Sequence, residues 1–228
     1  MDVTTFIIFI VAVIAGIIVA VIIKHKKAEG RKKELAGWAF SKGLNFNPAR
    51  DAGIDNRYDF KCLQRGDNRY GYNIVEGNIG NRPVRAFDYH YETHHTDSKG
   101  NRHTQHHYFS AVIVNANLPL KPLFIRQERL FDKLADFVGF NDIDFESAEF
   151  SKKFYVKSPD KKWAYDVLHQ ATMEFMLQSL QYDIEFSGRH VIAYRNKTLT
   201  VGYFEEAINL VNGILDRLPE SLIQEMKA

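Results

Sequence analysis

Six of the nine histidines fall between residues 90 and 107, and their spacing could support metal binding. They are His90, His94, His95, His103, His106 and His107. Residues two apart in a strand share a face, so His90, Glu92 and His94 would project together. If the chain turns near Gly100, an antiparallel hairpin places His106 close to opposite Glu92.

Imidazole and carboxylate groups gathered in this way could hold zinc, nickel or copper, because neutral imidazole is a good ligand for each ion. The candidate metal ligands are therefore His90, Glu92, His94 and His106. Two other interpretations stay open. The histidines could belong to an exposed hairpin tip without a metal, since a one-residue slip in register would send them to opposite faces. They could also form a pH-responsive surface, since imidazoles titrate near neutrality.

Other patterns typical of catalysis are missing. The glycines at positions 66, 71, 77 and 80 match neither nucleotide-binding pattern, and no serine lies in a nucleophile elbow. The single cysteine, Cys62, excludes an intramolecular disulfide and a thiolate zinc site within one chain. Its apolar surroundings are typical of a buried residue. We predict no catalytic residue and no other cofactor.

The histidines are predicted to lie on a long antiparallel hairpin. β-branched and aromatic residues indicate strands at Arg69–Val75, Pro83–Thr93 and Tyr108–Asn115. Glycine and asparagine at residues 77–81 favour a turn between the first two strands. The polar residues 96–101 favour a second turn at the tip of the hairpin.

The rest of the chain predicts helices alternating with short strands. Pro119 and Pro122 are expected to break the chain before a helix. Helices are predicted at 127–138, from Pro159 to 176 with Ser158 as the N-cap, and at 203–217, and strands at 154–156, 182–186 and 190–195 with a turn at 187–189. Strands joined by tight turns predict an α+β fold, with antiparallel β-hairpins packed against about four helices.

An uncharged apolar stretch begins the chain. From Phe6 to Ile23 there are eighteen residues without a charge or an amide. A helix of this length spans roughly 27 Å, which is close to the thickness of a bilayer's hydrocarbon core. We expect a transmembrane helix, with residues 5–23 in the lipid bilayer. A cleaved signal peptide is the alternative, although it would need a basic start, and the only charge before the stretch is Asp2.

A basic run follows the apolar stretch. It consists of Lys24, Lys26, Lys27, Arg31, Lys32 and Lys33, opposed by Glu29. Because basic residues stay on the cytoplasmic side, we expect the N-terminus outside and the following domain in the cytosol, at the inner membrane of the cell. The run could also hold anionic lipid headgroups. Residues 31–42 predict a short helix, with Trp38 either at the membrane interface or in the core.

Charge separates the parts of the chain. The whole chain carries +2, but residues 24–33 contribute +5 and residues 34–228 contribute −2. Nucleic-acid binding is not expected, because it needs a clustered positive face. We predict a transmembrane anchor at 1–24, a basic juxtamembrane linker at 25–34 and a cytosolic α+β domain at 35–228. The last part is long enough for two subdomains, 35–140 and 141–228.

The order of features resembles a group of uncharacterised, single-span, membrane-anchored prokaryotic proteins with a cytosolic α+β domain. The similarity rests on Arg69-Tyr70-Gly71-Tyr72-Asn73 ending at Gly77, Phe87-Asp88-Tyr89-His90-Tyr91, Leu118-Pro119, Ile143-Asp144-Phe145, Phe150-Ser151 and Phe154-Tyr155-Val156. This resemblance covers most of residues 31–217. It implies a shared scaffold and supplies no catalytic residue.

Three functions remain in view at this point. The leading hypothesis is a non-enzymatic, membrane-tethered domain that binds an unidentified protein partner or organises a complex at the inner membrane face. The alternative is a metal-binding protein or metal-dependent enzyme that uses the histidines of the hairpin. The third is recognition of membrane lipid through residues 31–42.

Overall fold

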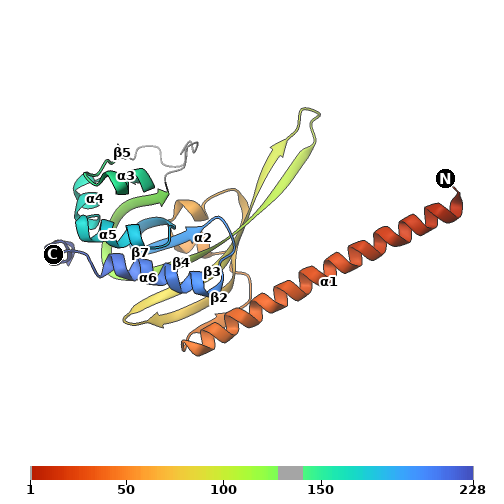
Figure 1. Cartoon of the computed structure of the whole chain (residues 1–228), viewed down its shortest axis with the longest axis horizontal. Coiled ribbons are helices and arrows are strands. Elements are labelled where there is room, and N and C mark those ends of the chain that lie inside the picture. Colours follow the sequence, from red (N-terminus) through yellow and green to blue (C-terminus); the bar gives the residue numbers. More distant parts are fainter. Residues whose placement is uncertain (1, 128–140, 228) are drawn as a thin grey trace.

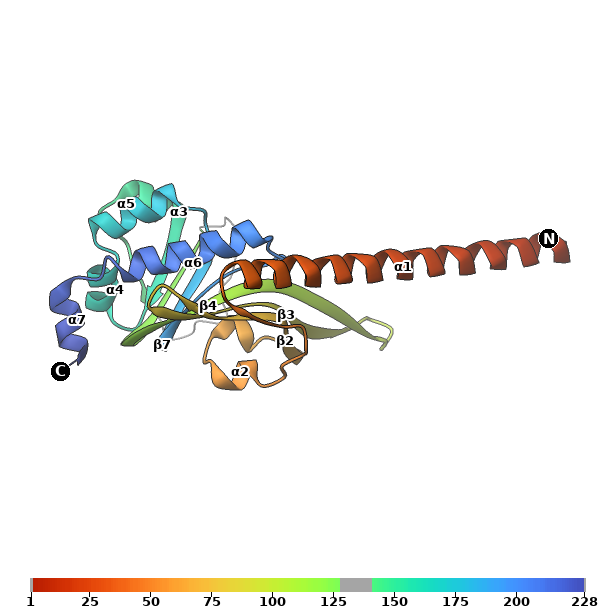
Figure 2. The ribbon, with the colours of Figure 1, turned by 90° about the horizontal axis from the view of Figure 1, so that it is seen from below.

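Seven antiparallel strands form one sheet in the computed structural model, which describes residues 2–127 and 141–227 (Figures 1 and 2). The strands are β1 (Asn45–Asn47), β2 (Asp67–Ile79), β3 (Arg82–Thr96), β4 (Arg102–Gln127), β5 (Asn141–Asp142), β6 (Phe154–Ser158) and β7 (Asp183–Arg195). The helices are α1 (Val3–Ser41), α2 (Ile54–Arg57), α3 (Ala148–Lys153), α4 (Lys161–Val167), α5 (Gln170–Gln178), α6 (Val201–Leu215) and α7 (Glu220–Lys227), with a 3₁₀ turn, η1, at Lys61–Leu63. The predicted α+β class is confirmed.

Strand β4 is the centre of the sheet. Its 26 residues pair with β3 and then β6 along one edge, and with β7 along the other. Strands β2 and β1 extend the sheet beyond β3, and β5 extends it beyond β6. Strands from both halves of the chain therefore belong to one sheet.

Two hydrophobic cores lie on the two faces of this sheet. Alternation along β4 sends Val112 and Val114 to the core beneath α6 and the end of α1, and Ala111 and Ile113 to the core beneath α2 and η1. Figure 2 shows α1, α3, α4, α5 and α6 on the first face and α2 on the second. The single cysteine, Cys62, is fully buried in the second core, as its apolar surroundings predicted.

Helix α1 is one continuous helix of 39 residues. The predicted apolar span and the predicted short helix at 31–42 both belong to it. Among the described residues it is the one helix long and apolar enough to cross a membrane, and none of its apolar window is buried in the protein. One face of its last turns is buried instead: Leu35 is 0% exposed, and Trp38 stacks on Phe204 with ring centroids 5.6 Å apart. Trp38 is thus a core residue.

A buried ion pair fixes the end of α1 to the sheet. Both Nε and Nη2 of Arg31 donate hydrogen bonds to the Asp88 carboxylate, at 3.2 and 3.0 Å. Asp88 also accepts hydrogen bonds from Ser110 at 2.6 Å and from Asn73 at 3.0 Å. The side chain of Asp88 is only 2% exposed, so these donors replace the water that the carboxylate lost. This contact joins α1 to β3.

Three of the interruptions predicted between strands differ in the structure. Pro119 and Pro122 do not break the chain, because they lie where the β4–β7 pairing shifts register, between Asn115 and Leu123. Residues 187–189 do not form a hairpin turn: β7 is one strand, and Gly188 takes a φ of 59° opposite Leu120 at the same irregularity. The turn at 77–81 is shorter than expected, since β2 continues to Ile79.

The helix predictions also need correction. The N-cap after β6 is Asp160, whose side chain accepts a hydrogen bond from the Trp163 N–H, and not Ser158. The helix expected up to residue 176 is two helices, α4 and α5, which separate at Leu168 and His169. The last long helix begins at Val201, two residues early, and α7 follows Pro219. Of the helix expected at 127–138, residues 128–138 lie outside the described residues, and Gln127 is the last residue of β4.

Candidate metal site at the base of the hairpin arm

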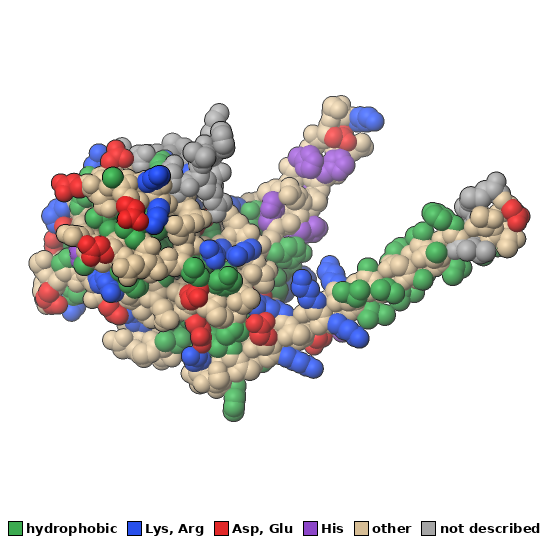
Figure 3. Space-filling view, viewed as in Figure 1, with side chains coloured by type: hydrophobic (Ala, Val, Ile, Leu, Met, Phe, Trp, Pro, Cys, Tyr) green, Lys and Arg blue, Asp and Glu red, His purple; other side chains and the backbone are tan. Residues whose placement is uncertain are grey.

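Strands β3 and β4 continue as a two-stranded arm, residues 91–107, which extends past the last pair of β2 with β3 at Asp67 and Glu92 (Figure 1). Tyr91 pairs with His107 at the base of the arm, and Thr96 pairs with Arg102 near its tip. Histidine side chains gather along the arm and at its base, as the space-filling view shows (Figure 3). A turn at residues 97–101 closes the tip, where the Asp97 carboxylate accepts the backbone N–H groups of Lys99 and Asn101 at 2.9 Å each. The predicted hairpin is confirmed.

The register of the arm divides the six histidines between two faces. Glu92 lies directly opposite His106, as predicted from the turn at Gly100. Because side chains alternate along a strand, His90, His94 and His106 share the face of Glu92. His95, His103 and His107 lie on the other face, where His95 stacks on His103 and His107 stacks on Tyr91.

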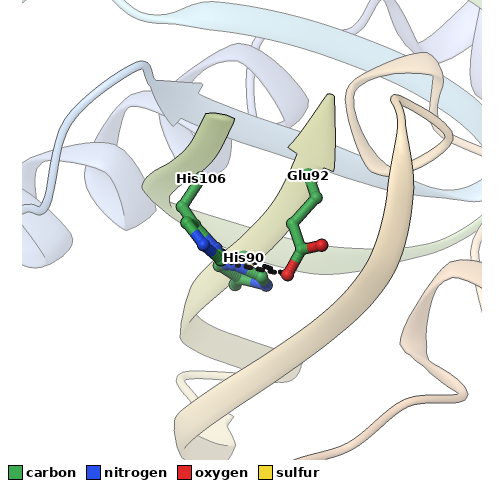
Figure 4. Close-up of side chains that lie close together, drawn as sticks. All are labelled: His90, Glu92 and His106. Carbon is green, nitrogen blue, oxygen red and sulfur yellow. Dashed lines mark hydrogen bonds and ion pairs between the residues drawn. The ribbon is translucent and has the colours of Figure 1, made fainter. Parts of the chain in front are cut away.

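Three of the predicted ligands converge at the base of the arm (Figure 4). The Nε2 atom of His90 lies 3.1 Å from Nδ1 of His106 and 3.8 Å from Oε1 of Glu92. The Nδ1 atom of His106 lies 3.3 Å from the same carboxylate oxygen. His90 and Glu92 come from β3 and His106 comes from β4, so the cluster joins the two strands of the arm.

Asn68 of β2 holds two members of the cluster. Its backbone oxygen lies 3.1 Å from Nδ1 of His90, and its side-chain amide donates to Oε1 of Glu92 at 2.6 Å. A carbonyl oxygen can only accept, so Nδ1 of His90 carries the proton and the neutral ring has its lone pair on Nε2. Nε2 is the nitrogen that faces His106 and Glu92 (Figure 4).

Burial sets the charge state of His90. Its side chain is 2% exposed, and the ring of Tyr70 stacks on it at 4.6 Å. Loss of solvent lowers the pKa of His90 below its usual value, which favours the neutral imidazole. The pKa of Glu92 is lowered, first by the hydrogen bond from Asn68 and then by the neighbouring histidines. A neutral imidazole beside a carboxylate is the state that binds metal ions.

The fourth predicted ligand, His94, lies apart from the cluster. Its Nδ1 atom contacts Thr104 Oγ1 at 3.0 Å, and its Nε2 atom lies 3.5 Å from Asp67 on β2. No site role is predicted from the sequence for Asn68, Tyr70 or Tyr108, although all three contact His90. Asparagine is enriched in left-handed backbone conformations, and that is the one sequence signal that could have singled out Asn68.

The basic residues after the apolar span differ in their surroundings. Lys24, Lys26, Lys27 and Lys33 are exposed. Lys32 pairs with Glu29 at 2.8 Å, and the Arg31 side chain is turned toward Asp88. Four lysines of the run are thus free of the domain core, while Arg31 belongs to the contact between α1 and the sheet.

Comparison with protein-family models finds no match, and comparison with curated proteins finds none either. Among solved structures, the chain is similar to the crystal structure of the mycobacterial trehalose monomycolate transport factor A, TtfA. The TM-score is 0.63 at 12% sequence identity, over 82% of this chain and 93% of that chain. At this identity the likeness shows a shared fold alone.

Proposed function

We propose that this protein is a membrane-tethered factor whose α+β domain lies in the cytosol and binds another protein at the inner membrane face. Continuity of α1 carries the proposal: one helix has an apolar span that is not buried in the protein and, near its end, residues that pack in the domain core, Leu35, Trp38 and Ala39. Its isoleucine, valine and phenylalanine side chains from Ile7 to Ile23 are 40% to 62% exposed where they are described. Such a surface is costly in water and favourable in lipid.

The charge pattern supports the proposed orientation. Lys24, Lys26 and Lys27 directly follow the apolar span and contact no acidic partner among the ion pairs of the described residues. Lysines at the end of a span resist transfer across the membrane, so the charge pattern supports a cytoplasmic position for the domain. The same lysines would lie beside anionic lipid headgroups.

The arm supports the proposed protein interaction. It extends from the same side of the domain as α1 in both ribbon views (Figures 1 and 2). A two-stranded ribbon gains little stability by itself in water, so a projecting arm is better suited to contact a partner than to support the fold. The similar crystal structure belongs to a protein named a transport factor, which is compatible with an accessory role at a membrane.

Extraction of membranes with alkaline carbonate tests the tether. We expect the full chain to stay in the membrane pellet and the double variant Ile14→Lys, Ile17→Lys to be released. Each lysine costs about 2.5–3.5 kcal/mol at the centre of a span. Phe40→Lys is the matched control, because Phe40 is 89% exposed on the same helix at its domain end. Release of the parent chain, or retention of the double variant, would contradict the proposal.

The intact mass of the membrane-bound chain tests the remaining alternative. A retained anchor predicts a polypeptide that still contains residues 6–23. A mass that begins after the apolar stretch would mean a cleaved signal peptide, and the tether would be lost with it.

A further inference from the structure

We infer that His90, Glu92 and His106 form a binding site for one divalent zinc-class ion, with a fourth coordination position open to water or to a ligand from outside the chain. The inference goes beyond membrane attachment and does not depend on it. It rests on the distances within the cluster, on the groups that orient the ligands, and on the backbone of β2 beside them.

The distances between the ligand atoms match tetrahedral zinc. Zinc lies about 2.0–2.1 Å from a histidine nitrogen or a carboxylate oxygen, so the ligands of a tetrahedral site are about 3.3 Å apart. The three separations in the cluster are 3.1, 3.3 and 3.8 Å. An ion can therefore reach all three atoms after shifts of a few tenths of an ångström, which side-chain torsions allow.

The ligands are oriented as metal ligands usually are. A ligating histidine donates its other ring N–H to a carbonyl or carboxylate, which fixes the tautomer and aims the lone pair at the metal. His90 does so through Nδ1 to the Asn68 carbonyl. Glu92 is held by the Asn68 amide, so one residue orients two of the three ligands.

The backbone at Asn68 is unusual in the same place. Asn68 has a φ of 47°, a left-handed conformation that costs free energy for residues other than glycine. The pairing of β2 with β3 shifts register between Asp67 and Tyr70, which marks a β-bulge. Bulges and strained residues concentrate beside functional sites, where they aim backbone groups. Here the strained residue directs its carbonyl at His90.

The surroundings leave one side of the site open. The His106 side chain is 54% exposed, whereas His90 and Glu92 are 2% and 15% exposed. Among the described residues, no fourth histidine, cysteine or carboxylate joins the group. Three protein ligands with an open position are typical of zinc sites that bind water or an incoming ligand. An ion here would also tie β3 to β4 where the arm leaves the sheet.

Zinc titration of the full chain, purified in detergent without a histidine tag and stripped with a chelator, tests the site. We expect one zinc ion per chain by calorimetry and elemental analysis. His106→Ala and Glu92→Gln should each weaken binding by about 100-fold or more, since changes to outer-shell groups alone cost 10- to 100-fold. Asn68→Gly keeps the left-handed backbone but removes the amide, and it should weaken binding by about 10- to 100-fold.

The double variant His94→Ala, His103→Ala is the matched control, since it removes two histidines of the arm from outside the cluster. It should bind zinc as the parent chain does. The site is refuted if the parent chain binds no zinc, if His106→Ala binds it equally well, or if the control loses as much affinity as His106→Ala. Far-UV circular dichroism of each variant reports whether it is folded. His106 is exposed, so its replacement leaves the core unchanged.

Discussion

At the scale of single residues, the sequence predicted which side chains gather at the base of the arm better than it predicted Asn68, which contacts two of them. Glu92 and His106 could be paired because a strand alternates with a period of two and the turn lay near Gly100. Asn68 could not be found in this way. Its role depends on a bulge in β2 and on a left-handed φ, and neither follows from the hydrophobic pattern.

Gly66 tests how closely the chain just before β2 must approach the backbone of Glu92. Its φ is 57°, and a Cβ atom placed there would lie 2.0 Å from the backbone oxygen of Glu92. Gly66→Ala should destabilise the fold by about 1–3 kcal/mol through overpacking, in addition to about 1 kcal/mol for the left-handed backbone. Gly80→Ala is the matched control, because Gly80 has a φ of 63° and nothing within 4 Å.

Chemical denaturation of both glycine variants measures the difference. Gly80→Ala should lower the free energy of unfolding by only about 1 kcal/mol, which is the cost of the left-handed backbone. Equal losses in Gly66→Ala and Gly80→Ala would show that Gly66 does not lie against Glu92.

Arg31 was predicted as part of a basic run at the membrane, but it has a structural contact as well. Arg31→Ala leaves the buried Asp88 carboxylate without its cation, which should cost about 3 kcal/mol in the free energy of unfolding. Lys32→Ala removes a more exposed ion pair with Glu29 and should cost less than about 1 kcal/mol.

Denaturation of the full chain in detergent compares the two variants. Adding Asp88→Asn to Arg31→Ala should recover part of the loss, because the unpaired charge is then gone. Similar small losses for Arg31→Ala and Lys32→Ala would contradict the buried contact.

At the scale of elements, the strands whose partners are close in sequence were predicted, and those shaped by distant pairing were not. The hairpin of β3 and β4 follows from local alternation and turn residues. The length of β4 and the unbroken course of β7 could not be predicted from local sequence. They depend on the pairing of residues 110–125 with residues 184–195, which are distant in the chain. A proline or glycine that would end an isolated strand is accommodated there by a bulge.

The arm provides a prediction for one element. Replacing residues 94–104 by Asn-Gly joins Thr93 to Gln105, which are paired across the arm, with a two-residue turn. Most of the removed residues are exposed, so the midpoint of thermal unfolding should change by no more than about 2 °C. The cluster of His90, Glu92 and His106 is kept, and zinc binding should be kept with it. A large loss of stability would mean that the arm supports the fold.

At the scale of the whole molecule, α1 connects a lipid-compatible surface to the domain core without a break. The sequence predicted the apolar span and the α+β class, since both follow from composition and periodicity. It did not predict that the span and the juxtamembrane residues form one helix. That depends on Leu35 and Trp38 packing against distant parts of the chain, with Trp38 on Phe204.

Labelling of one introduced cysteine at a time with a membrane-impermeant maleimide tests the central claim most directly. The native Cys62 is fully buried, so the parent chain serves as the unlabelled reference. We predict that Asp2→Cys is labelled in intact spheroplasts, whereas Ser98→Cys at the exposed tip of the arm is labelled only after lysis. Labelling of Ser98→Cys in intact spheroplasts would contradict a membrane-tethered domain that faces the cytosol.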